Sequence, residues 1–110
     1  TGTLGARKTW IALGSRAAGE ITIDDGARTA LVERQTSLLP AGVTAVTGAF
    51  EVGDAVVLKD RSGTVIARGL SGLSAIDLDR VKGMKTSRIA EEFPHLAGKA
   101  VVHRDRLAIL

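Results

Sequence analysis

The stretch of the sequence that most restricts the fold runs from Gly19 to Val43 and reads GEITIDDGARTALVERQTSLLPAGV. At its start, Ile21 and Ile23 alternate with polar residues. Side chains of a β-strand point alternately to its two faces. This period of two therefore predicts a strand that buries one face and exposes the other.

A short helix is expected directly after this strand. Either Asp24 or Asp25 can accept hydrogen bonds from the free N–H groups at the start of a helix, and both lie favourably at its positive end. Ala27, Ala30 and Leu31 follow at helical spacing and give the helix a small apolar face. Because these side chains are small, such a helix can lie close to a sheet.

Most of the remaining chain is predicted to form short strands. Residues 37–43 close the first unit as a turn in which Gly42 supplies an unusual backbone conformation. The β-branched and apolar runs that follow predict strands over residues 43–50, 55–59, 64–69 and 99–103. The turn signal D-R-S-G at residues 60–63 joins two of them.

Two small helices are expected between these strands. Ser74 can cap a helix over residues 75–82, with Ile76 among its apolar positions, and a second helix over residues 87–93 ends before Pro94. The chain is therefore predicted to be α+β and mostly β. The expected architecture is a compact pseudo-barrel of about five to six short strands with two or three small helices.

The ordered motifs in this chain resemble those of a known family. They are GEITIDDGA, SLLPAGV, VTGAF, GDAV, IARGL and AVVHRD, and they follow an R-K-T-W signature at residues 7–10. Together they resemble a PUA domain (pseudouridine synthase and archaeosine transglycosylase type), specifically the one at the C-terminus of bacterial glutamate 5-kinases. The resemblance implies a PUA domain over residues 7–110, preceded by an interdomain linker remnant at residues 1–6.

The resemblance also implies what the rest of such a protein does. Its kinase domain phosphorylates the γ-carboxylate of L-glutamate with ATP and magnesium, the first step of cytoplasmic proline biosynthesis. Those catalytic, ATP and magnesium residues lie outside this chain, so no catalytic, cofactor or metal residue is assigned here. The expected partner is the kinase domain of the same polypeptide, and the fragment alone is not expected to be an enzyme.

Composition excludes several other functions. The 110 residues include no cysteine and two histidines, so thiolate chemistry is excluded and a zinc site is not expected. No apolar run approaches the roughly 20 residues of a membrane helix, and no membrane partner is predicted. Two motif look-alikes fail as well. Glu20 follows the glycine-spaced GSRAAG where a phosphate loop needs lysine, and HRD at residues 103–105 lacks the asparagine of a kinase loop.

Binding is the remaining function, and two hypotheses stay open. The first is an accessory domain that packs against the kinase domain or its oligomer and influences activity or regulation. The second is an RNA-binding module, since PUA domains commonly hold structured RNA beside the first helix. It is supported by the basic second half of the chain, which carries nine Lys/Arg against five Asp/Glu in residues 61–110. The candidate contacts for RNA or a partner are Gly26, Ala27, Arg28, Arg34, Leu39, Gly42, Lys59, Arg61, Arg68, Arg80, Lys82, Lys85 and Arg88.

Overall fold

The computed structural model describes residues 17–110, so the predicted linker at 1–6 and the R-K-T-W signature lie outside the described residues. Five strands form one mixed sheet: β1 (Gly19–Ile23), β2 (Val43–Gly48), β3 (Ala55–Lys59), β4 (Val65–Leu70) and β5 (Leu107–Ile109). The helices are α2 (Asp25–Arg34), α3 (Ala75–Val81) and α4 (Thr86–Glu92), with three-residue 3-10 turns at Pro40–Gly42, Pro94–Leu96 and Arg104–Arg106. The α+β, mostly β class is thus confirmed.

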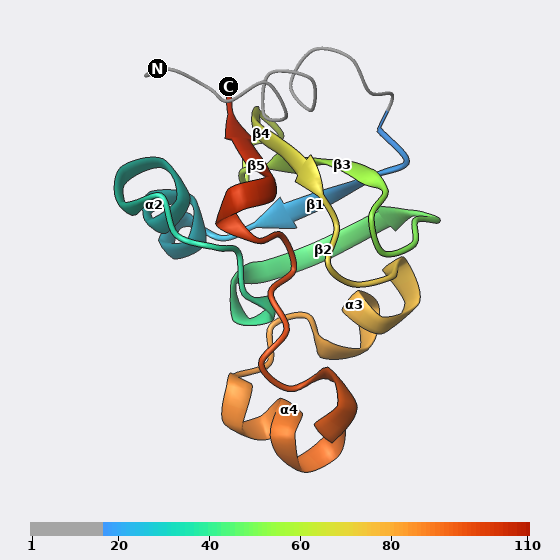
Figure 1. Cartoon of the computed structure of the whole chain (residues 1–110). Helices are drawn as coiled ribbons and strands as arrows, with labels where there is room; N and C mark the ends of the chain where they lie inside the picture. Colours follow the sequence, from blue (N-terminus) through green and yellow to red (C-terminus); the bar gives the residue numbers. More distant parts are fainter. Residues whose placement is uncertain (1–16) are drawn as a thin grey trace.

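The strand order in the sheet is β2-β1-β3-β4-β5. All neighbouring pairs are antiparallel except β1 and β3, which run parallel and pair Ile21 with Leu58. Figure 1 shows α2 at one end of this curved sheet, while α3 and α4 lie below β2. The parallel pair forms because the chain between β1 and β3 passes through α2 and β2 before it returns beside β1.

Local capping explains where the helices begin. The Asp24 carboxylate accepts a hydrogen bond from the N–H of Ala27 at 2.7 Å, and Ser74 accepts one from the N–H of Asp77 at 3.2 Å. Both caps satisfy N–H groups that have no partner inside their helix. The predicted helix starts after Asp24 and Ser74 are therefore confirmed.

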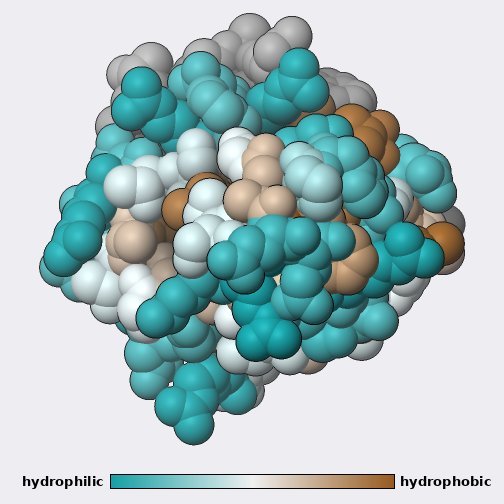
Figure 2. Space-filling model, turned by 90° about the horizontal axis from the view of Figure 1, so that it is seen from below, coloured by the Kyte–Doolittle hydropathy of each residue, from teal (hydrophilic) through white to brown (hydrophobic). Residues whose placement is uncertain are grey.

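Within residues 17–110 the core is one cluster of mainly aliphatic side chains that includes the buried ring of Phe50, and the partly buried Phe93 packs against it. The alternation in β1 works as predicted, since Ile21 and Ile23 are fully buried. Leu31 brings the apolar face of α2 to the same cluster, and Leu78 and Val81 do so for α3. Figure 2 shows the outer surface from the side of α4, where hydrophobic residues reach the surface in several small patches among hydrophilic ones.

Some predictions about local structure are wrong. Residues 99–103 do not form a strand: Val102 makes an isolated bridge to Leu38, and the last strand of the sheet is β5, farther along the chain. The HRD string accordingly lies in the 3-10 turn that precedes β5. Ile76 is not a core residue, because its side chain is 65% exposed on α3.

Candidate functional site

A shallow groove runs between α2 and the segment that links α2 to β2. Its volume is about 280 Å³. Four of the predicted contact residues line it, namely Gly26, Ala27, Leu39 and Gly42. The remaining lining residues are Asp24, Ala30, Leu31, Thr36, Ser37, Leu38 and Ala41. The structure therefore brings these four predicted contacts together, at the helix start and on the Leu-Pro turn.

Close packing of Gly42 against Ala27 sets the width of the groove. A Cβ atom placed on Gly42 would lie 2.5 Å from the Cβ of Ala27, which is far inside van der Waals contact. The N–H of Asp24 donates to the carbonyl of Gly42 at 2.9 Å and holds the two segments together. The predicted unusual conformation of Gly42 is wrong, since this residue is not among those with a positive φ. Glycine is required here because of the close approach.

The groove is mainly an apolar surface. Leu39 lies at its edge with 49% of its surface exposed, whereas Leu31 and Leu38 are buried in its floor. Two of its polar side chains already have partners inside the domain. Asp24 caps α2, and the Ser37 hydroxyl accepts a hydrogen bond from the N–H of Arg104 at 2.8 Å. The groove consequently suits an apolar side chain better than a phosphate group.

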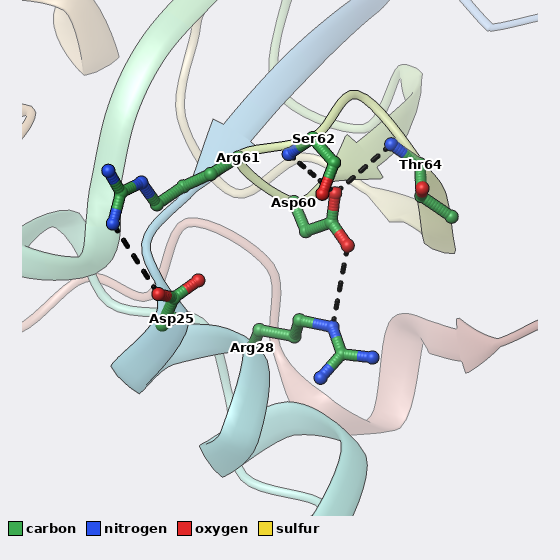
Figure 3. Close-up of polar contacts among 6 residues, drawn as sticks. All are labelled: Asp25, Arg28, Asp60, Arg61, Ser62 and Thr64. Carbon is green, nitrogen blue, oxygen red and sulfur yellow. Dashed lines mark hydrogen bonds and ion pairs between the residues drawn. The ribbon is translucent and has the colours of Figure 1, made fainter.

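Several predicted basic contacts are paired with acids of the same domain. Figure 3 shows α2 joined to the β3–β4 turn by two ion pairs, Arg28 with Asp60 at 3.5 Å and Arg61 with Asp25 at 3.4 Å. Asp60 is the centre of this arrangement. Its side chain is 13% exposed, and its carboxylate also accepts hydrogen bonds from the N–H groups of Ser62 and Thr64 at 2.9 and 3.1 Å.

The remaining predicted cations lie in several places. Lys59 on β3 pairs with Glu20 on β1 at 2.7 Å. Lys82, at the C-cap of α3, pairs with Asp79, and on α4 Arg88 pairs with Glu92. The hydrogen bond from Arg88 to Glu92, together with the charge of that carboxylate, raises the pKa of the Arg88 guanidinium.

Five of the nine predicted cations thus face a carboxylate of their own domain. Arg34, Arg80 and Lys85 are exposed, and Arg68 is half-buried on β4. They belong to different elements: Arg34 ends α2, Arg80 lies on α3, and Lys85 directly precedes α4. Their roles as contacts stay predictions.

Two further observations concern metals and membranes. In the part of the chain that the structure describes, no three His, Asp or Glu side chains come together as metal ligands. Within residues 17–110, no helix is long and apolar enough to cross a bilayer.

Known proteins of similar sequence and fold were compared with this chain. The PUA domain family matches residues 19–93. The glutamate 5-kinase of Syntrophus aciditrophicus is 46% identical over 107 residues, which is 97% of this chain and 28% of that protein. The glutamate 5-kinase of Synechococcus sp. (strain JA-2-3B'a(2-13)) is 49% identical over 105 residues, 96% of this chain and 28% of that protein. The chain therefore spans under a third of the length of these relatives, where it corresponds to the C-terminal domain.

Solved structures have the same fold. A PUA domain from Aeropyrum pernix K1, determined as a tartrate complex, aligns with a TM-score of 0.58 and 25% identity, over 78% of this chain and 41% of that one. A conserved PUA domain protein from Thermoplasma acidophilum aligns with a TM-score of 0.57 and 21% identity, over 76% of this chain and 46% of that one. The mixed sheet, the capped helix beside it and the matched sequence over residues 19–93 show that this chain belongs to the PUA domain family.

Proposed function

We propose that this chain is the accessory PUA domain of a glutamate 5-kinase and that it acts on the kinase domain rather than on a substrate. The observation that carries the proposal is the extent of the similarity. Glutamate 5-kinases are 44–49% identical to this chain over 96–100% of its length. In those relatives the domain shares its chain with a kinase domain, which is the partner that we propose here.

The proposal assigns the chemistry to the rest of the polypeptide. The whole protein transfers the γ-phosphoryl group of ATP, with magnesium, to the γ-carboxylate of L-glutamate in the cytoplasm, as the first step toward proline. ATP, magnesium and glutamate bind the kinase domain. The PUA domain contributes contacts that change substrate affinity, the response to proline or the assembly of the enzyme.

We do not propose RNA as the ligand of the groove. Binding of RNA depends largely on cations that neutralise phosphates. Five of the nine candidate cations are already paired with carboxylates, and the groove itself is lined mainly by apolar groups. Titration of a labelled structured RNA at about 50 mM salt tests this conclusion, since phosphate-driven binding is strongest at low salt.

Deletion of the domain from the full-length protein tests the proposed function. We expect a change in at least one of three quantities: the KM for glutamate, the inhibition by proline, or the oligomeric state measured by light scattering. A full-length Glu91→Ala variant serves as the control, because Glu91 is exposed on α4 and is not among the candidate contacts. If all three quantities are the same with and without the domain, the proposed function is wrong.

A further inference from the structure

Two large aliphatic residues, in segments that backbone hydrogen bonds join, are open to solvent. Val52 and Ile76 are 66% and 65% exposed, more than the other large hydrophobic residues that the structure describes. Val52 lies in the turn over residues 51–54, which joins β2 to β3, and Ile76 lies in the first turn of α3. Exposed aliphatic groups that lie near each other mark a site of contact more often than isolated ones do.

Backbone hydrogen bonds hold these two segments together. The N–H of Ala75 donates to the carbonyl of Phe50 at 2.9 Å. The N–H of Gly53 donates to the carbonyl of Ser71 at 2.8 Å, and the N–H of Ser71 donates to the carbonyl of Asp54, also at 2.8 Å. Because both segments are fixed in this way, the surface is already formed before a partner binds, and little conformational entropy is lost on binding.

The charges around these residues are mainly negative. Glu51, Asp54 and Asp77 lie in the same two segments, and none of them forms an ion pair within residues 17–110. Arg80, four positions after Ile76 on α3, is the nearest cation along that helix face. This acidic surface belongs to a chain whose net charge is +3. Such a surface repels polyanions and complements an apolar patch bordered by Lys or Arg.

We infer that Val52, Ile76 and the carboxylates of Glu51, Asp54 and Asp77 form a docking surface for the kinase portion of the same polypeptide. The inference rests on the proposed function and specifies the surface through which the domain acts. The glutamate 5-kinase relatives extend well beyond the matched part, which is 28% of their length, so a covalently linked partner is available in them. Covalent linkage gives a high effective concentration, so a small apolar centre with a charged border is sufficient for docking.

Cysteine labelling of the full-length protein tests the docking surface. These 110 residues contain no cysteine, so Val52→Cys and Ile76→Cys each introduce one thiol here, and mass spectrometry of the labelled peptide reports on that thiol alone. Val65→Cys is the control, because Val65 is 40% exposed at the start of β4, at the opposite end of that strand from Ser71. We expect Val52→Cys and Ile76→Cys to react with a maleimide at least about tenfold more slowly than Val65→Cys, since labelling then requires undocking.

A charge reversal shows whether the acidic border contributes. In the Ile76→Cys protein, Glu51→Lys is expected to raise the labelling rate several-fold. Glu33→Lys on α2 makes the same change of charge at an exposed residue outside the docking surface and is expected to leave the rate unchanged. Equal effects of the two substitutions would show that net charge matters and that the border does not.

Carbodiimide cross-linking identifies the partner. Links from Glu51, Asp54 or Asp77 to lysines of the kinase portion support the inference. Links to this domain in a second copy of the chain overturn it, as does labelling of Ile76→Cys as fast as that of Val65→Cys. If cross-linking or labelling overturns the docking surface but deletion of the domain still changes the enzyme, the proposed function stands. If deletion has no effect, the proposed function is wrong, whatever the labelling shows.

Discussion

Replacing Gly42 with alanine tests the packing that sets the width of the groove. The new Cβ would lie 2.5 Å from the Cβ of Ala27, whereas carbon atoms in contact are normally about 3.5–4.0 Å apart. The two segments must therefore separate by roughly 1 Å, which strains the hydrogen bond from Asp24 to Gly42. Overpacking of this kind costs about 1–3 kcal/mol.

A second substitution should relieve the clash. Ala27→Gly removes the atom that the new Cβ meets, and the next neighbours, the Cα of Ala27 and the Cδ1 of Leu38, are 3.7 and 3.8 Å away, which is ordinary contact. Glycine within a helix costs about 0.5–1 kcal/mol relative to alanine. We therefore expect Gly42→Ala with Ala27→Gly to be more stable than Gly42→Ala alone, which gives a coupling energy of about 1–3 kcal/mol, equal to the overpacking that is relieved.

Urea unfolding followed by circular dichroism measures these differences in the free energy of unfolding. A change in stability shifts the midpoint of unfolding and leaves the m-value unchanged. Gly26→Ala is the matched control. Its added Cβ would meet the Oδ1 of Asp24 at 3.5 Å, an ordinary contact, and alanine favours the helix, so stability should stay the same or rise by up to about 1 kcal/mol. If Gly42→Ala is as stable as the original chain, or if the costs at positions 27 and 42 simply add, the packing argument is wrong.

Three further substitutions test single interactions by the same unfolding measurement. Asp24→Ala removes the cap of α2 and should lower the free energy of unfolding by about 1 kcal/mol. Asp24→Asn keeps an oxygen acceptor and should retain most of the stability. Equal losses for the two variants would show that the cap is unimportant. Asp60→Ala removes the acceptor of two turn N–H groups and breaks an ion pair, so it should lower stability by about 1–3 kcal/mol. Arg61→Ala breaks only an exposed ion pair and should cost less than about 1 kcal/mol. A larger loss for Arg61→Ala than for Asp60→Ala would contradict the role of Asp60. Phe50→Ala empties a fully buried site and should cost about 3–5 kcal/mol, and a loss below about 1 kcal/mol would place the ring outside the core.

The sequence predicted the elements that depend on near neighbours. The alternation around Ile21 gives β1, and the acceptor side chains of Asp24 and Ser74 fix the starts of α2 and α3. The D-R-S-G turn forms as expected, because Asp60 binds N–H groups two and four positions later. Each of these features is decided within a few residues, so it can be read from the local pattern.

The sequence was misleading where a residue's neighbours come from far along the chain. The run at 99–103 is as apolar as a strand, but it bridges to Leu38 and leaves the edge of the sheet to β5. Ile76 was counted with Leu78 and Val81 among the apolar positions of α3, yet it is exposed. It lies two and five positions from them, so it is on a different face of the helix, and this miss could have been avoided from the local spacing. Gly42 was expected to be glycine for its backbone conformation, whereas the structure requires glycine because its close neighbour Ala27 lies 15 positions earlier in the sequence.

The sequence by itself determined the family, the short strands and the helix caps. The tertiary structure alone decided that β1 and β3 run parallel, that Arg28 and Arg61 face carboxylates, and that the segments carrying the exposed Val52 and Ile76 are joined by backbone hydrogen bonds. The physical reason is that capping and side-chain alternation act over a few residues, whereas pairing, neutralisation and exposure depend on which distant segments the folded chain brings together.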